Sequence, residues 1–192
     1  MNLISKMWKI HKNKKLYFKY VMEHKNNILK AYDEMLKCKD LEWIMQDPLI
    51  QVRLLIRAHN HDDSKLSKEE FNAYRKHYFP IDIEEFNANA ADYQKAWDHH
   101  KTHNDHHWQA RINWKDEDFN INTELACLEN IMDWLAVGYK FNDRPYEYYE
   151  QNKDKIILPK KQREFIEKCI YQGIDKQYIL LKEDNCDITN ML

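Results

Sequence analysis

Glycine is almost absent from this chain, which has only Gly138 and Gly173 among its 192 residues, together with four prolines. Because glycine and proline mark turns and interrupt helices, a chain with so few of them is free to form long helices. Lys, Glu, Leu and Ala are plentiful and lie in segments that alternate charged and apolar residues, a pattern typical of helices with one buried face. The sequence therefore predicts an all-α protein.

The same scarcity excludes several classes of function. A Walker A loop, a dinucleotide-binding fingerprint and a nucleophile elbow each need at least two closely spaced glycines. The four cysteines are far apart and include no C-x-x-C pair, so neither a zinc ribbon nor a redox motif is present. Dispersed free thiols fit a reducing compartment, and we expect a cytoplasmic protein. These cysteines are Cys38, Cys127, Cys169 and Cys186.

The overall charge gives no sign of a nucleic-acid partner. The chain has 30 basic and 32 acidic residues and a formal charge of −2, so it lacks the excess of positive charge that binding to phosphate backbones requires. Lys6 to Lys19 is a local basic run, which we interpret as a solvated or frayed N-terminus. Lys6, Lys9 and His11 interrupt any signal peptide, and no segment approaches the roughly 20 apolar residues that span a bilayer. We therefore expect no membrane partner.

The length fits one domain of about six to seven helices, with a core over 16–142 and a helical extension over 143–192. Helices are expected over 16–36, from Pro48, over 68–78, 84–103, from 123 to near 138 and over 160–171, with a short one near Pro145. Residues 111–122 are expected to form a loop, and the polar tail from Leu181 is a candidate for disorder. Apolar stripes are predicted to turn His24 inward in the first helix and to bury Leu49, Val52, Leu55 and Ile56 in the second.

Two local signals mark the starts of later helices. Ser67 and Glu70 have the spacing of a capping box, in which each side chain would bind a free backbone N–H of the following helix. Thr123 is expected to cap the fifth helix, which carries Asp133 beside its apolar stripe. Gly138 is expected near the end of that helix.

Histidines are concentrated in one short stretch. Five of the ten lie between His99 and His107, and Trp97 and Trp108 enclose them. Imidazole is the commonest nitrogen ligand for transition metals, so this density indicates a metal site. The pairs His99-His100 and His106-His107 are seven residues apart, close to two helical turns, which can bring members of both pairs to one face. Adjacent residues diverge by about 100° on a helix, so only one of His99 and His100 can face the site.

Further ligands are expected from other helices. His61 and Asp62 are adjacent and offer one nitrogen and one carboxylate, and a carboxylate can bridge two cations. His24 from an earlier helix and Asp133 from a later one would complete an octahedral site of nitrogen and oxygen ligands. Such a set suits Fe, Mn, Co or Zn better than Ca. His59, His77 and His103 are interpreted as ordinary polar-face residues, and the tryptophans as core or rim side chains.

The order of these residues resembles that of the HD-domain metal-dependent phosphohydrolases, whose pattern is H…HD…D and whose two-metal members carry extra histidines before the last aspartate. The run from His61 through Lys65 also resembles their HD-x-[GS]-K segment. Within this superfamily, 61–71, 96–108 and Asp133-Trp134 are most similar to a small HD-like family from Firmicutes and their phages, with Leu66 in place of a phenylalanine. The resemblance covers most of 16–139.

The resemblance implies a role for each matching residue. His24, His61, Asp62 and Asp133 would hold a first divalent transition metal, and Asp62 would bridge to a second ion. His100, with His106 or His107, would hold this second ion or contact the substrate phosphate. Mn, Fe, Co, Ni and Zn are the candidate metals, with one or two ions bound. Catalysis would use Asp62, with Lys65 neutralising a phosphate oxygen and Asn104 donating a hydrogen bond to it.

The resemblance therefore predicts a phosphohydrolase that uses metal-activated water on a phosphate ester, with a nucleotide or cyclic nucleotide as the preferred substrate class. Two alternatives remain open at this stage. One is a non-catalytic interaction protein, such as an inhibitor of a host factor, on the same scaffold. The other is a di-iron oxygenase of the HD type. The sequence specifies neither the exact substrate nor the oligomeric state.

Overall fold

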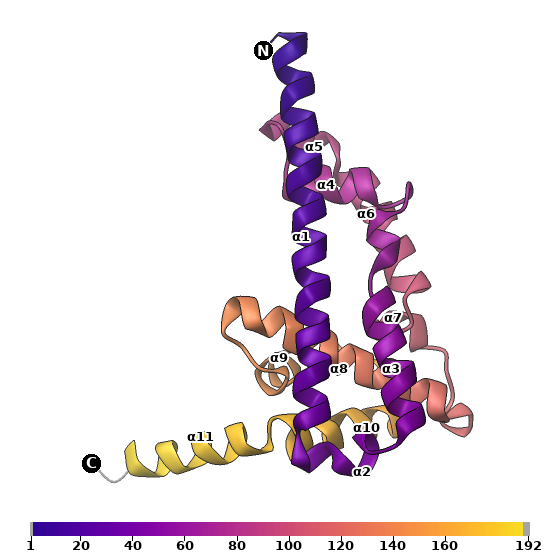
Figure 1. Ribbon diagram of the computed structural model, residues 1–192, viewed down its shortest axis with the longest axis vertical. Helices are drawn as coiled ribbons and strands as arrows, with labels where there is room; N and C mark the ends of the chain where they lie inside the picture. Colours follow the sequence, from indigo (N-terminus) through magenta and orange to yellow (C-terminus); the bar gives the residue numbers. More distant parts are fainter. Residues whose placement is uncertain (1, 190–192) are drawn as a thin grey trace.

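A computed structural model describes residues 2–189, with side chains through residue 182, and helices form most of that part of the chain (Figure 1). No strand occurs among these residues, which confirms the all-α prediction. The described helices are more numerous than the six to seven expected, because several are short. They are α1 (Leu3–Lys37), α2 (Glu42–Met45), α3 (Pro48–Asn60), α4 (Phe71–Tyr78), α5 (Ile83–Ala88), α6 (Ala90–His103), α7 (Trp108–Arg111), α8 (Ile121–Phe141), α9 (Pro145–Asn152), α10 (Lys160–Cys169) and α11 (Lys176–Thr189).

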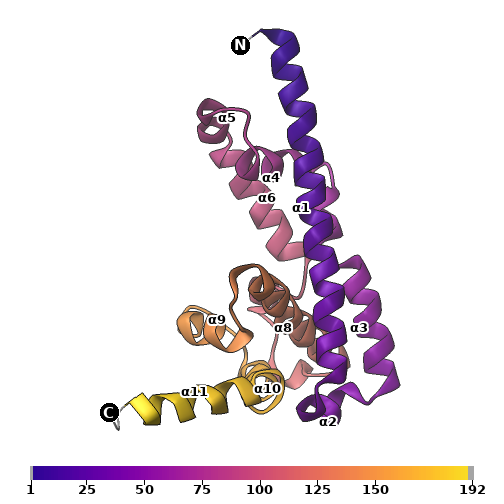
Figure 2. The same ribbon diagram turned by 60° about the vertical axis from the view of Figure 1, so that its left-hand side comes forward.

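Helix α1 runs along the whole molecule and contacts α4 near its N-terminal half and α3 and α8 near its C-terminal half (Figures 1 and 2). It begins at Leu3, well before the expected start, and the Asn2 side chain caps it by accepting a hydrogen bond from the Ser5 N–H. The basic run from Lys6 to Lys19 is therefore helical, and the interpretation as a frayed terminus is wrong. Its lysines are exposed, as expected for a solvated face.

Two clusters of buried side chains form the core. A smaller cluster joins Tyr17 and Val21 of α1 to Ala73 and Tyr74 of α4 and to Ala96 of α6. The larger cluster joins the C-terminal half of α1 to α3, α8 and α10. Because α1 contributes to both, it fixes the position of one cluster relative to the other.

The buried face of α3 differs from the predicted one. Ile50, Leu54 and Ala58 are buried, four residues apart, whereas the predicted stripe is exposed. Both stripes have helical spacing, and packing of α3 against α1 and α8 decides between them. The exposed stripe consists of Leu49, Val52, Leu55 and Ile56.

Helix α8 lies at the centre of the larger cluster and starts earlier than predicted. Asn120 is its N-cap, and its side chain accepts a hydrogen bond from the Asn122 N–H at 2.9 Å, while Thr123 is the third residue of the helix and completes a capping box. The helix also continues beyond Gly138 to Phe141, and Asn142 ends it in the left-handed conformation with φ 55°. Asparagine tolerates this conformation better than most residues.

The segment before the histidine cluster also differs from expectation. The predicted helix over 84–103 is divided into α5 and α6 at Asn89, whose amide donates a hydrogen bond to the Ala73 carbonyl at 2.8 Å. No capping box forms at Ser67 and Glu70, because Glu70 is fully buried and its carboxylate binds histidines instead. In the predicted loop over 111–122, the regular secondary structure is limited to the end of α7, a 3₁₀ turn η3 (Asp116–Asp118) and the first residues of α8.

The C-terminal extension packs back onto α1 through Arg144, which pairs with Glu34 of α1 at 2.9 Å and with the buried Asp175 at 2.6 Å. Between α10 and α11 the chain makes a π-helical turn, η4 (Ile170–Ile174). Helix α11 continues into the polar segment for which the sequence favoured disorder, and residues 190–192 lie outside the described part. No helix in the described range is long and apolar enough to cross a membrane.

We predict that Gly138→Ala destabilises the protein. In an exposed helix this change would add about 1 kcal/mol of stability. At Gly138, however, a Cβ atom would overlap the backbone carbonyl of Asp143, which cannot rotate away as a side chain can. We expect the free energy of unfolding to fall by about 1–3 kcal/mol in urea denaturation. Lys140→Ala on the same helix is the control, and an increase in stability for Gly138→Ala would contradict the prediction.

Candidate metal centre

The candidate site lies between the two core clusters, where α1, the end of α3, α6, the segment after α6 and α8 meet. His24 is on α1 between Val21 of the smaller cluster and Ile28 of the larger one, about one turn from each. Asp133 of α8 faces it, with 3.2 Å between His24 Nε2 and Asp133 Oδ1. The inward orientation predicted for His24 is thus present, with its side chain 15% exposed.

Asp62 occupies the centre of the site in an unusual backbone conformation. It directly follows the last residues of α3 and has φ 57° and ψ 22°, in the left-handed region. Only two non-glycine residues among those described have positive φ, and aspartate is one of the few side chains that tolerate it. This turn leads into η2 (Asp63–Leu66) and directs His61 and Asp62 into the interior. Such strained residues are concentrated at functional sites in proteins.

Four side chains converge on a first position. His24 Nε2 lies 3.3 Å from His61 Nε2 and 3.5 Å from Asp62 Oδ2, and His61 Nε2 lies 3.4 Å from the same oxygen. Asp133 Oδ1 is 3.6 Å from His61 Nε2. Ligands about 2.1 Å from one ion are about 3.0 Å apart at octahedral edges and about 3.4 Å apart at tetrahedral edges. These separations therefore fit His24, His61 and Asp133 around a single ion, with Asp62 Oδ2 close to both histidines.

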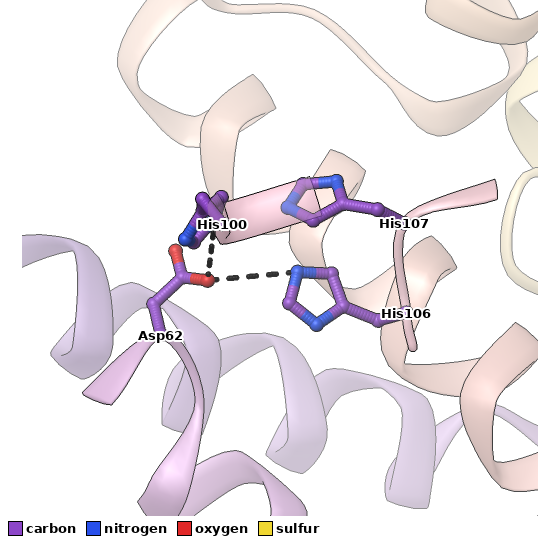
Figure 3. Close-up of side chains that lie close together, drawn as sticks. All are labelled: Asp62, His100, His106 and His107. Carbon is purple, nitrogen blue, oxygen red and sulfur yellow. Dashed lines mark ion pairs between the residues drawn. The ribbon is translucent and has the colours of Figure 1, made fainter. Parts of the chain in front are cut away.

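A second group forms around the other oxygen of the same carboxylate (Figure 3). Asp62 Oδ1 lies 3.2 Å from His100 Nε2 and 3.6 Å from His106 Nε2. His107 completes the group, whose four ligand atoms all lie within 4.8 Å of one another. Asp62 is thus placed between two groups, with Oδ2 in the first and Oδ1 in the second.

The second group contains buried polar atoms that lack a hydrogen-bond partner. Within the described part of the chain, Asp62 Oδ1, His106 Nε2 and His107 Nε2 are buried without one. Leaving such atoms unsatisfied costs about 1–3 kcal/mol each, and more for a charged group. Their presence in one place fits a bound cation, so these buried histidines and carboxylates could hold a metal ion.

Glu129 of α8 orients one histidine from each group. Its Oε1 atom lies 2.7 Å from His61 Nδ1 and 3.3 Å from His106 Nδ1, and Arg57 holds its Oε2 atom at 2.5 Å. With the Nδ1 protons donated to Glu129, both Nε2 atoms present lone pairs toward the two groups. Carboxylates that fix histidine ligands in this way are characteristic of metal centres. The sequence analysis missed Glu129, although it lies one helical turn before Asp133 and interrupts an apolar stripe.

Glu70 has the corresponding role for His100. Its Oε2 atom is 3.0 Å from His100 Nδ1, which leaves His100 Nε2 directed at Asp62. Its Oε1 atom binds His99 Nδ1 at 2.7 Å, so His99 faces away from the ligand groups and is partly exposed. This agrees with the expectation that only one of the two adjacent histidines can face the site. The sequence analysis missed this role of Glu70, because its spacing from Ser67 assigned it to a capping box.

The two remaining residues with predicted catalytic roles lie beside Asp62 and His100. The Lys65 ammonium forms an ion pair with Asp62 Oδ2. The Asn104 amide nitrogen donates to Ser64 Oγ at 2.9 Å and to the His100 carbonyl at 2.8 Å. Asn104 therefore positions Ser64 and His100 in this arrangement, and its predicted bond to a phosphate requires it to release one of these partners.

The electrostatics of the site keep its carboxylates ionised. Burial opposes ionisation of Asp62, but His61 and Lys65 outweigh it and hold the pKa of this carboxyl well below its usual range. Burial likewise opposes ionisation of Asp133, and its histidine neighbours lower that pKa well below the usual range. Burial keeps the pKa of the His107 imidazole well below its ordinary value. Burial disfavours the charged forms of His24, His61 and His100, but their carboxylate neighbours outweigh it and raise the pKa of each imidazole. The site thus offers ionised carboxylates and a neutral His107, and the other three histidines would release their protons when a metal binds.

A pocket of about 300 Å³ opens beside both groups. His107 from the second group and Asp133 from the first are among its lining residues. Its walls are largely aromatic, from Trp97, Trp108, Trp134, Phe141 and Tyr148. A small concave site with apolar walls and a few convergent polar groups is the usual form of a binding site for an organic ligand.

Comparison with known proteins places the chain in a family. The model of DUF5662, described as a family of unknown function, matches residues 13–172. The chain belongs to this family. The match includes every residue of the two ligand groups, together with Glu70 and Glu129. No curated protein and no solved structure matches the chain.

We predict that Glu129→Gln lowers metal affinity at both positions, by about 10- to 100-fold. The neutral amide oxygen is a weaker acceptor for the two Nδ1 protons than the carboxylate, and the amide NH2 group cannot accept from Arg57, so His61 and His106 lose their fixed orientation. Glu70→Gln is the matched comparison, because it contacts only His100 of the ligand groups and should weaken one position alone. Isothermal titration with Mn²⁺ or Zn²⁺ would distinguish the two. Unchanged affinity in Glu129→Gln, with the fold intact by circular dichroism, would refute the positioning role.

Proposed function

We propose that the protein is a metal-dependent phosphohydrolase that acts on a phosphate ester. The observation that carries the proposal is the position of the Asp62 carboxylate, whose Oδ2 atom lies 3.5 Å from His24 Nε2 in one group and whose Oδ1 atom lies 3.2 Å from His100 Nε2 in the other. A shared carboxylate of this kind is typical of centres in which two cations act together. The order of the residues along the chain, His24, His61-Asp62, the histidine pair and Asp133, gives the proposal independent support.

The donor atoms suggest which metals the centre takes. The two groups offer only imidazole nitrogens and carboxylate oxygens, without a thiolate. This set suits Mn, Fe, Co, Ni or Zn. Such ions, when bound, lower the pKa of a coordinated water to near neutrality and screen the charge of a phosphoryl group.

The side chains of the protein have three tasks in this reaction. Asp62 and Asp133 supply carboxylate ligands, and Glu129 and Glu70 hold the histidine rings in position. Lys65, next to Asp62, contributes a positive charge that can neutralise a phosphate oxygen. Burial of these groups excludes bulk water, which strengthens every charge interaction with the substrate.

The aromatic pocket favours a nucleotide or cyclic nucleotide as the substrate. His107 and Asp133 belong both to the ligand groups and to the pocket lining, so a phosphate at the ligand groups would leave the rest of the molecule within reach of the pocket. Aromatic walls bind nucleobases by stacking, which contributes about 1–3 kcal/mol for each base.

We expect purified protein to contain stoichiometric transition metal and to hydrolyse members of a panel of nucleotides and cyclic nucleotides. Asp62→Asn should lose most of the metal by elemental analysis and lower turnover more than about 100-fold, since it removes the charge shared by both groups. Asparagine tolerates the left-handed backbone, so the fold should persist. Asp63→Asn is the control, because that exposed side chain pairs with Lys25 and belongs to neither ligand group. Full metal content in Asp62→Asn would refute the assignment of the ligands.

Metal without any turnover across the panel would instead favour a binding protein on the same scaffold. Iron-dependent optical absorption that changes with oxygen would favour an oxygenase. These two readouts keep the alternatives separate from the proposed activity.

We predict that Phe141→Ala, at the exposed rim of the pocket, raises KM for a nucleotide by about tenfold or more, because a stacking surface is lost. Its kcat, and the hydrolysis of bis(p-nitrophenyl) phosphate, should change little, because the apolar Phe141 side chain supplies neither a metal ligand nor a charge. Phe18→Ala, at a similarly exposed aromatic residue outside the pocket, is the matched control. Equal losses for both substrates would contradict the role of the pocket in binding the base.

A further inference from the structure

The first two turns of α1 extend beyond the rest of the molecule, past α4, α5 and α6, in both views (Figures 1 and 2). The helix is anchored just after them. The Lys9 ammonium donates to the Ile81 carbonyl at 3.4 Å, and the Asn13 amide donates to the Phe79 and Pro80 carbonyls at 3.0 and 3.1 Å. We call residues 3–8 the apolar tip.

Large apolar side chains cover this tip and remain exposed to solvent. Leu3, Ile4, Met7 and Trp8 are 73%, 81%, 62% and 63% exposed. Positions i, i+1, i+4 and i+5 share one face of a helix, and at about 100° per residue this face lies opposite Lys9 and Asn13, which contact the body. The rest of the described chain therefore leaves this face uncovered.

The charge around the tip has a single sign. Residues 2–22 contain six lysines and no acidic residue, although the whole chain has a formal charge of −2. Lys6 lies within the tip, the other five lysines follow it along the helix, and all six are exposed. They are Lys6, Lys9, Lys12, Lys14, Lys15 and Lys19.

We propose that the tip and these lysines bind the surface of an anionic lipid membrane. Exposed Leu, Ile, Met and Trp side chains beside lysines are the combination that enters the boundary between headgroups and acyl chains, while the lysines pair with anionic headgroups. Amphipathic helices of this kind bury their apolar face about 5–10 Å into that boundary, a depth that large apolar side chains can reach.

Other occupants fit these observations less well. A second copy of the same helix would bring six lysines against six others, which is repulsive. A nucleic acid would use the lysines but would leave the apolar tip uncovered. The earlier expectation of no membrane partner rested on the lack of a spanning segment, and this does not bear on a helix that inserts only its end. The inference is independent of the metal centre.

Co-sedimentation of the full chain with vesicles tests the proposal. Vesicles of phosphatidylcholine alone would be compared with vesicles that contain phosphatidylglycerol. We expect binding to the anionic vesicles only, and weakening by salt because screening reduces the attraction. Ile4→Asp with Trp8→Asp should abolish binding. Replacing Lys12, Lys14, Lys15 and Lys19 by glutamine should weaken it by about fivefold for each lysine.

Matched controls separate these effects from a general change in the protein. Val52→Asp alters a similarly exposed apolar residue on α3, and Lys160→Gln with Lys161→Gln alters lysines elsewhere. The controls should bind like the unaltered protein, and the tip variants should keep its helicity and metal content. Absence of binding to anionic vesicles, equal binding to neutral ones, or binding that survives the loss of Ile4 and Trp8 would overturn the proposal. Self-association through the tip, detected by ultracentrifugation without lipid, would also overturn it and identify a second copy as the partner.

Discussion

The carboxylate of Asp62 is the constraint on which the rest of the structure depends. A charge buried this deeply costs several kcal/mol unless partners compensate for it. Here His24 and His61 approach one oxygen, His100 approaches the other, and Lys65 adds a positive charge. These partners come from separate elements of the chain, so satisfying one carboxylate requires α1, α3, η2 and α6 to meet at one point. The two core clusters lie on either side of this meeting point.

The charged residues that surround Asp62 are also buried and also have compensating partners. Glu70 and Glu129 are buried as well, and each holds histidine rings through their Nδ1 atoms. Arg57 in turn compensates for Glu129. Well-packed apolar side chains of similar volume would often be equally or more stable than such a buried charged network. Groups with strongly shifted pKa values that gather beside a pocket are more typical of a functional site than of a structural core.

Helix α1 links the site to the surface of the molecule. It carries His24 at its middle and the apolar tip at its start, 16 residues away from Trp8, or about 24 Å along a straight helix. Binding of the tip to a membrane surface would therefore hold the candidate metal centre at a set distance from that surface. The aromatic pocket, which opens beside His107 and Asp133, would remain accessible to small molecules.

The sequence by itself determined the helical class, through its lack of glycine and its apolar periodicity. Through residue type and order, it also predicted which histidines and aspartates would lie together at the candidate site. Local sequence patterns were less informative where more than one structure is compatible with the same residue spacing. Either of two stripes on α3 has helical spacing, and Ser67 with Glu70 has the spacing of a cap that does not form. Only tertiary packing decides such cases, because the burial of a side chain depends on which other elements pack against its helix. Packing also decided the roles of Glu70 and Glu129 and the division of Asp62 between two groups, since these arise from contacts between helices far apart in the chain.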